Sequence, residues 1–231
     1  MIVAIGKQEI EPIRLSLPYK LGTVNCYLIK TDTGYVLIDT GSSNSRAELE
    51  KELASTGCQP GNLKLIVITH GDFDHIGNAA FLRATFGAKI AMHYGDFGMA
   101  EHGDMFWNRK KGNPLLRMIA PLMFGFSQAY RFKPDLSIVD GTDLSEYGFN
   151  AHVVSIPGHS KGSIGILIAN GDLFCGDLLD NTAKPALNSI MDDLATAHAS
   201  LAKLESLKIK TVYPGHGNPF PMELFKQSYL A

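Results

Sequence analysis

The segment His70-Gly71-Asp72-Phe73-Asp74-His75 places two histidines and two aspartates within six residues. It follows the apolar run Leu63 to Thr69, which is rich in β-branched residues and typical of a strand buried on both faces. It precedes a predicted helix over Ala79 to Phe86. The polar segment therefore lies at the carboxyl end of a predicted strand, where α/β sheets bind ligands because the loops there converge on a crevice.

Before this segment, two short apolar runs predict a β-hairpin. Asn25 to Ile29 and Tyr35 to Ile38 are separated by the turn-forming tetrapeptide Thr31-Asp32-Thr33-Gly34. The second run ends at Asp39, so a second polar residue follows directly after a predicted strand.

Two further helices are expected from their termini. Ser45 and Glu48 are three residues apart and predict a capping box at the start of a helix that ends near Gly57. Ser189 is expected to begin the second helix, which has apolar residues at a helical spacing around Leu201.

The carboxyl-terminal half has the pattern of a second sheet. Short apolar runs at His152 to Ile156, Ile164 to Ile168, Asp172 to Cys175 and Ile209 to Tyr213 are divided by glycine-bearing loops. No repeat and no linker interrupts them, and the composition is 45% hydrophobic and 19% charged, typical of a chain that buries a sizeable core. We therefore expect one domain over residues 1–231.

Between the two halves, the pattern loosens from His93 to about Asp135, where prolines interrupt any long helix. Residues 93–135 are interpreted as an insertion near the active site or at a subunit interface, so a homodimer is possible. The Met and Phe residues of Leu115 to Phe126 are expected in a core or a dimer surface more than in a lid over the substrate.

Charge and cysteine content restrict the partners. The formal charge is −2 and like charges do not cluster, so we expect a small-molecule substrate and neither a nucleic acid nor a membrane surface. The three scattered cysteines, Cys26, Cys58 and Cys175, favour a reducing compartment. The first residues lack the apolar stretch of a secretory signal, and the cytoplasm is therefore the expected location.

Five polar clusters each follow a strand-like run, and imidazoles and carboxylates on such loops are ligands for Zn, Fe or Mn. Residues two apart in an extended segment point the same way, so one ion is expected to be shared by His70, Asp72 and His159. A second ion is expected to be bound by Asp74, His75 and His216, and Asp177 is expected to bridge the two ions.

This ordered set resembles the metallo-β-lactamase superfamily, and the resemblance covers almost the whole chain. It implies an α/β fold with four layers in the order αββα and a metal site at one edge of the two sheets. It also implies two divalent ions and a metal-dependent hydrolase in which a bridging hydroxide attacks a small ester, thioester, lactone or phosphodiester. By the same resemblance, Asp74 handles a proton, while Asp39 supports the metal-binding loops without binding an ion itself.

One position departs from the family pattern, which usually reads H-x-H-x-D-H, because this chain has Asp72 in place of the second histidine. The flavodiiron oxygen reductases of the superfamily also carry a carboxylate there. An extra carboxylate lowers the net charge of the centre, so Fe and Mn are expected to compete with Zn. The alternative function is therefore a non-haem di-iron or mononuclear iron redox enzyme, either an oxygenase or an oxygen reductase.

Overall fold

The computed structural model describes residues 9–109, 118 and 128–229. The strands are β1 Glu9–Ser16, β2 Thr23–Thr31, β3 Gly34–Ile38, β4 Leu63–Ile68, β5 Lys89–Met92, β6 Leu136–Ser137, β7 Ala151–Ser155, β8 Ile164–Ile168, β9 Asp172–Gly176, β10 Leu179–Asp180, β11 Ala186–Leu187, β12 Thr211–Pro214 and β13 Phe220–Pro221. The helices are α1 Arg46–Ser55, α2 Phe73–Ile76, α3 Ala79–Phe86, α4 Phe97–His102, α6 Leu194–Glu205 and α7 Met222–Tyr229.

Two main sheets form the centre of the molecule. The first has the strand order β1-β2-β3-β4-β5-β6, antiparallel from β1 to β3 and parallel from β3 to β6. The second has the order β13-β12-β9-β8-β7, in which only β12 and β9 are parallel. Strands β10 and β11 form a separate hairpin pair. The predicted sheets of both halves are thus present.

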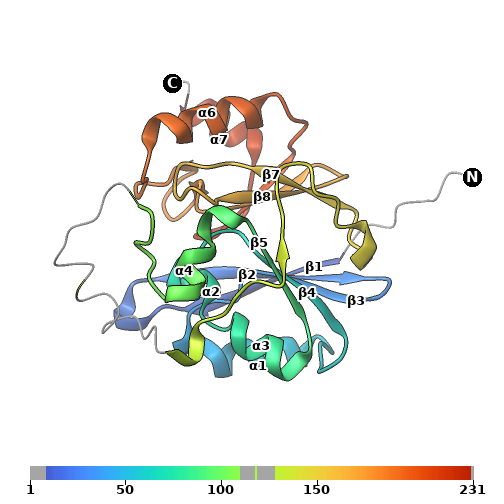
Figure 1. The fold of residues 1–231 in the computed structure, drawn as a ribbon. Helices are drawn as coiled ribbons and strands as arrows, with labels where there is room; N and C mark the ends of the chain where they lie inside the picture. Colours follow the sequence, from blue (N-terminus) through green and yellow to red (C-terminus); the bar gives the residue numbers. More distant parts are fainter. Residues whose placement is uncertain (1–8, 110–117, 119–127, 230–231) are drawn as a thin grey trace, which may run out of the picture.

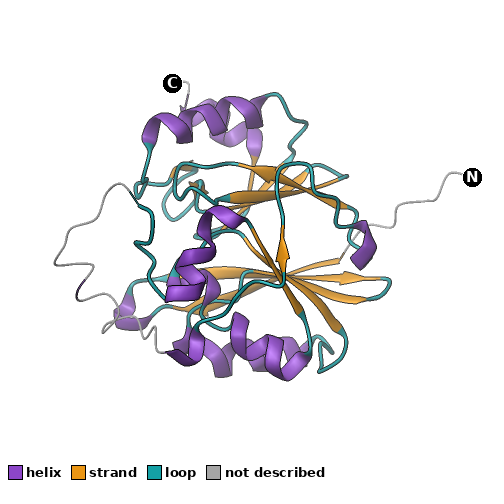
Figure 2. Cartoon of the chain, in the orientation of Figure 1, coloured by secondary structure: helices purple, strands orange, loops and turns teal. Residues whose placement is uncertain are grey.

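Helices cover the outer face of each sheet, and Figures 1 and 2 show α6 and α7 on one side and α1 and α3 on the other. Alternation along β2 explains how one strand serves two layers. Cys26 and Leu28 join the core beneath α1 and α3, whereas Tyr27 and Ile29 join the core between the sheets. A third core packs α6 and α7 against the second sheet. This layering confirms the predicted αββα sandwich.

The amino-terminal side differs from the prediction in two ways. Strand β1 was not predicted, because only Ile13 and Leu15 of its eight residues are buried. The capping box was also wrong. The hydroxyl of Ser45 donates to Ser42 O at 2.9 Å, and the Glu48 carboxylate accepts from the amide of Ser16 at 3.1 Å. Helix α1 begins where expected, but Glu48 holds the end of β1 instead of closing the helix.

Helix α6 begins at Leu194 and not at Ser189. Asp193 caps it, since its carboxylate accepts from the amide of Thr196 at 3.1 Å. The residues before this cap are loop, and the carbonyl of Ile190 accepts a hydrogen bond from His159. The delayed start of the helix therefore supplies a backbone acceptor to a predicted metal ligand.

The insertion is described only in part. Helix α4 lies within the insertion, whereas residues 110–117 and 119–127 lie outside the described residues. Of the segment Leu115 to Phe126, for which a core or a dimer surface is expected, only Met118 is described. None of the helices in the described part of the chain combines the length and the apolar surface that a membrane span requires.

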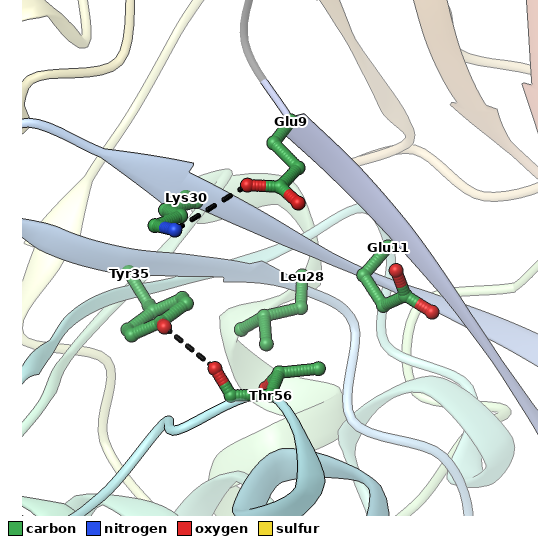
Figure 3. Close-up of a pocket in the computed structure, with 6 residues that line it drawn as sticks. All are labelled: Glu9, Glu11, Leu28, Lys30, Tyr35 and Thr56. Carbon is green, nitrogen blue, oxygen red and sulfur yellow. Dashed lines mark hydrogen bonds and ion pairs between the residues drawn. The ribbon is translucent and has the colours of Figure 1, made fainter.

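A small cavity of about 120 Å³ lies beside the end of α1, on the face of the first sheet away from the second (Figure 3). Lys30 pairs with Glu9 across β1 and β2 at 3.5 Å, and both side chains are well exposed. The Tyr35 hydroxyl donates to Thr56 O at 2.8 Å and ties β3 to α1. Because the Lys30–Glu9 ion pair is solvated, it contributes little to stability. The lining of the cavity includes no predicted metal ligand.

Candidate metal centre

The loops that carry the predicted ligands meet where the two sheets are joined by main-chain hydrogen bonds. The amide of Asn25 in β2 donates to Gly215 O at 2.8 Å, and the amide of Ile164 in β8 donates to Thr69 O at 2.9 Å. His70 follows β4, His159 follows β7, Asp177 follows β9 and His216 follows β12. The ends of strands from both sheets thus bring these side chains to one edge of the sandwich.

Two groups of three residues have ligand atoms within 4.8 Å of one another: His70, His159 and Asp177, and Asp74, His75 and His216. Asp72 lies beside the first group, with Oδ2 3.0 Å from His159 Nε2 and 3.7 Å from His70 Nε2. All seven residues that the sequence suggests as ligands therefore lie together.

Asp177 stands between the two groups. Its Oδ1 is 3.4 Å from His75 Nε2, and its Oδ2 is 3.3 Å from His216 Nε2. The same Oδ2 is 4.0 Å from Nε2 of both His70 and His159. One carboxylate thus faces four imidazoles, which is the placement that a bridging ligand requires.

The four imidazoles are oriented by contacts at their other nitrogen. His159 Nδ1 donates to Ile190 O at 2.6 Å, and His216 Nδ1 donates to Thr23 O at 2.8 Å. His75 Nδ1 is held by Asp39, and His70 Nδ1 lies 3.1 Å from the Thr69 hydroxyl. Holding Nδ1 leaves every Nε2 facing the centre, as in metal sites whose histidines are oriented by outer hydrogen bonds.

Asp39 is buried and points away from the centre. Its Oδ1 accepts from the amide of Thr69 at 2.8 Å, and its Oδ2 lies 2.7 Å from the Thr69 hydroxyl and 2.8 Å from His75 Nδ1. Its φ of 58° is in the left-handed region, which aspartate tolerates better than most residues. These contacts fix the residue just before His70 and the ring of His75 at the same time.

Several buried polar atoms at this centre lack a partner among the described residues. They include His70 Nε2, His75 Nε2 and Asp177 Oδ1. A buried polar atom without a partner is costly and calls for an explanation such as an ion. Imidazole nitrogens and carboxylate oxygens are the donors that Zn, Fe and Mn accept, so the residues present fit a metal centre.

The carboxylates also perturb the pKa values of the imidazoles. Burial lowers the pKa of His216, but Asp177 and Asp74 outweigh it and raise the pKa to about 11. Burial also opposes the charged form of His75, yet Asp177 and Asp39 raise its pKa well above the usual value. Both shifts favour the protonated imidazoles, so an ion that binds these nitrogens must compete with protons.

Sequence reasoning missed Arg109, which belongs to the insertion. Its Nη2 donates to Asp72 Oδ1 at 2.6 Å and lies 3.4 Å from His159 Nε2. The side chains of Arg109 and Asp72 are only 7% and 8% exposed. Nothing in the spacing of the motif points to an arginine 37 residues after Asp72. Burial hinders ionisation of Asp72, but Arg109 and His159 hold its pKa well below the usual range.

A second missed residue, Asp96, links the loops of the two sheets. Its carboxylate accepts from the amide of Gly71 at 3.1 Å, from the Ser160 hydroxyl at 2.5 Å and from the amide of Gly162 at 2.8 Å. These donors flank His70 and His159. Asp96 therefore ties the loop of His70 to the loop of His159 through these hydrogen bonds.

The four histidines that the sequence analysis leaves outside the site have contacts elsewhere. His93 accepts from the amide of Gly95, the ring of His102 packs against Trp107 and His198 lies 3.2 Å from the hydroxyl of Tyr229. His152 is exposed on β7. None of them belongs to the two ligand groups found among the described residues.

Comparison with known proteins agrees with this geometry. The chain is 27% identical over 203 residues to the atrochrysone carboxyl ACP thioesterase of Aspergillus fumigatus, a match that covers 86% of this chain and 52% of that protein. It is 29% identical over 161 residues to the hydroxyacylglutathione hydrolase GloC of Haemophilus influenzae, covering 67% of this chain and 66% of that one. The chain thus spans about half the length of the first relative and two thirds of the second.

A solved structure, described as TTHA1623 in a di-iron-bound form, superposes with a TM-score of 0.72 at 28% identity and covers 94% of this chain and 97% of that chain. The family model described as the Metallo-beta-lactamase superfamily matches residues 19–216. With the four layers and the ligand loops in the order that the sequence predicts, the chain belongs to the metallo-β-lactamase superfamily.

Proposed function

We propose that this chain is a metal-dependent hydrolase of acyl substrates, thioesters above all, with a centre of two divalent ions. The observation that carries the proposal is the position of Asp177, whose carboxylate faces the imidazoles of both ligand groups. A thioesterase and a hydroxyacylglutathione hydrolase among the relatives support acyl transfer to water. Zn, Fe and Mn are the candidate metals.

The seven candidate ligands are assigned to two ions. His70, Asp72 and His159 would hold one ion, Asp74, His75 and His216 would hold the other, and Asp177 would contact both. When bound, the ions supply Lewis acidity and lower the pKa of water toward neutrality. The protein contributes rigid orientation, since Nδ1 of each imidazole is held by a separate contact.

Asp74 is the candidate for proton transfer. It lies in α2, with Oδ2 3.4 Å from His216 Nε2 and Oδ1 4.0 Å from His75 Nε2. Its carboxylate can accept a hydrogen bond from a water molecule at the centre and so orient its attack on an acyl carbon. The proton taken from that water can then pass to the leaving thiolate or alkoxide.

A substrate panel tests the proposal. The protein is stripped with a chelator, reloaded with Zn, Mn or Fe(II), and assayed on chromogenic thioester, ester, lactone and phosphodiester substrates. We expect thioester hydrolysis to have the largest kcat/KM and to disappear after chelation. Faster phosphodiester cleavage, or thioester cleavage that survives chelation, would contradict the proposal.

A redox function is the second candidate, and it is favoured by the carboxylate at Asp72 and by the di-iron form of the solved relative. An oxygen electrode distinguishes the two functions. If the iron-loaded protein consumes oxygen with an added reductant, faster than free iron does, and hydrolyses none of the substrates, the redox function replaces the hydrolase.

A further inference from the structure

We propose that Arg109 is a positioning residue for the metal centre, and that Asp72 and Arg109 together replace the second histidine of the family's usual motif. The proposal rests on the metal centre of the proposed function but not on which bond is cleaved. Arg109 holds Asp72 Oδ1 and leaves Oδ2 facing His70 and His159.

The geometry divides the two oxygens of Asp72 between different partners. Oδ1 is 2.6 Å from Arg109 Nη2, a short charge-assisted hydrogen bond, while Oδ2 is 3.0 Å from His159 Nε2. A free carboxylate could rotate and present either oxygen or both. The guanidinium removes this choice, so that Asp72 offers a single oxygen to the first ligand group, as an imidazole would offer a single nitrogen.

The charges also match. In the usual motif two carboxylates face two divalent ions, whereas in this chain Asp72 adds a third carboxylate beside Asp74 and Asp177. The positive charge of Arg109 offsets the negative charge that Asp72 adds to the centre. Both side chains are largely buried, so solvent screens this interaction weakly. This charge offsets the extra carboxylate from which the sequence analysis expected Fe and Mn to compete with Zn.

Other acidic groups add to the negative charge near the guanidinium. Asp96 and Asp192 lie close enough to favour its charged form in addition to Asp72. Arg109 Nε is buried without a partner among the described residues, so Asp72 holds the side chain through Nη2. The hydrogen bond between Arg109 and Asp72 therefore fixes the two side chains relative to each other.

The test measures metal content, which does not require a known substrate. Wild type, Arg109→Ala, Asp72→His and the double variant are stripped, titrated with Zn or Mn at buffered free concentrations, and analysed for bound metal after gel filtration. We expect two ions per chain in wild type. We expect Arg109→Ala to keep one ion and to bind the other on the order of 10- to 100-fold more weakly, as for other supports of metal ligands.

The double variant decides between positioning and a purely structural role. An imidazole at position 72 needs no guanidinium, so Asp72→His with Arg109→Ala is expected to recover two ions. Asp72→His alone is expected to bind metal more weakly than the double variant, because Arg109 then lies buried beside a third imidazole without its nearest anion. Each single substitution is thus harmful alone, and the second repairs it.

Two controls keep the result interpretable. Arg83→Ala removes another Arg–Asp pair, formed with Asp135 at 3.5 Å on the surface, and should leave metal content unchanged. Arg109→Lys retains the charge and should recover part of the affinity if Arg109→Ala fails to fold. Two ions bound with wild-type affinity by Arg109→Ala would overturn this inference alone, whereas wild type that binds no metal would overturn the proposed function as well.

Discussion

The carboxylate of Asp39 lies 2.8 Å from Nδ1 of His75, on the opposite side of the ring from Nε2, which faces Asp177 at 3.4 Å. His75 is fully buried and thus has an anion at each nitrogen. The outer anion fixes the ring and its protonated nitrogen, which leaves the inner nitrogen to bind an ion. Asp39 would therefore influence metal binding through the ring of His75, without contacting an ion itself.

Replacing Asp39 with Asn tests this relationship. Asn tolerates the positive φ of 58° and keeps the size of the side chain, so the change removes mainly the charge. We expect affinity for the ion held by His75 to fall on the order of 10- to 100-fold. Competition with a chromogenic chelator measures the affinity, and wild-type affinity would show that the carboxylate of Asp39 is unimportant.

Replacing Asp177 with Ala removes a carboxylate that lies within 4.0 Å of imidazoles from both ligand groups. We expect hydrolysis to fall by at least about 10²-fold because reacting groups lose their fixed positions, with a far-ultraviolet circular dichroism spectrum like that of wild type. Asp180→Ala, at a half-buried position of strand β10, is the matched control and should remain active. A fully active Asp177→Ala variant would contradict the bridging role.

Gly215→Ala tests how closely the backbone approaches Asp177. A Cβ at residue 215 would overlap Oδ1 of Asp177 and lie 2.8 Å from Cε1 of His75. The φ of Gly215 is not in the left-handed region, so crowding and not backbone strain causes the effect. We expect bound metal to fall below two ions per chain in elemental analysis. Unchanged metal content would mean that the Asp177 carboxylate can shift without loss.

Replacing Asp96 with Ala leaves the amides of Gly71 and Gly162 and the hydroxyl of Ser160 without their acceptor. An unsatisfied buried donor costs about 1–3 kcal/mol, so we expect the free energy of unfolding to fall by about 3 kcal/mol or more in urea denaturation. Ser160→Ala removes a single donor and should cost less. Equal losses in the two variants would show that Asp96 does not join the two loops.

The metal-free and metal-loaded proteins are expected to respond to pH in opposite ways. The pKa of His216 rises from 6.5 to about 11 on folding, so its contribution to stability is complete below pH 6.5 and is lost as pH rises toward 11. Ions bind the deprotonated imidazoles, so their contribution grows with pH. Melting temperatures of stripped protein should fall over this interval, and the gap to loaded protein should widen. If the melting temperatures of stripped and loaded protein changed with pH in parallel, His216 would not be a metal ligand with a raised pKa.

Much of the fold was accessible from local pattern. Continuous apolar runs such as Ile164–Ile168 are buried on both faces, which matches strands that lie between two layers. The helix over Ala79–Phe86 has the predicted limits because Gly87 ends it in a left-handed conformation. Strand β1 escaped prediction because a half-exposed edge strand carries a weak apolar signal.

The sequence alone predicted the candidate ligand set, because the loops and the short helix α2 that carry it follow strands, and short connections at strand ends point toward one edge of a sandwich. Only the tertiary structure showed that Arg109 and Asp96 contact the candidate site. They approach Asp72 and Ser160 across 37 and 64 residues of chain, and contacts over such separations depend on how the segment that carries α4 packs against both ligand loops. Local periodicity and motif spacing carry no information about that packing, because it depends on side chains from two layers meeting at once.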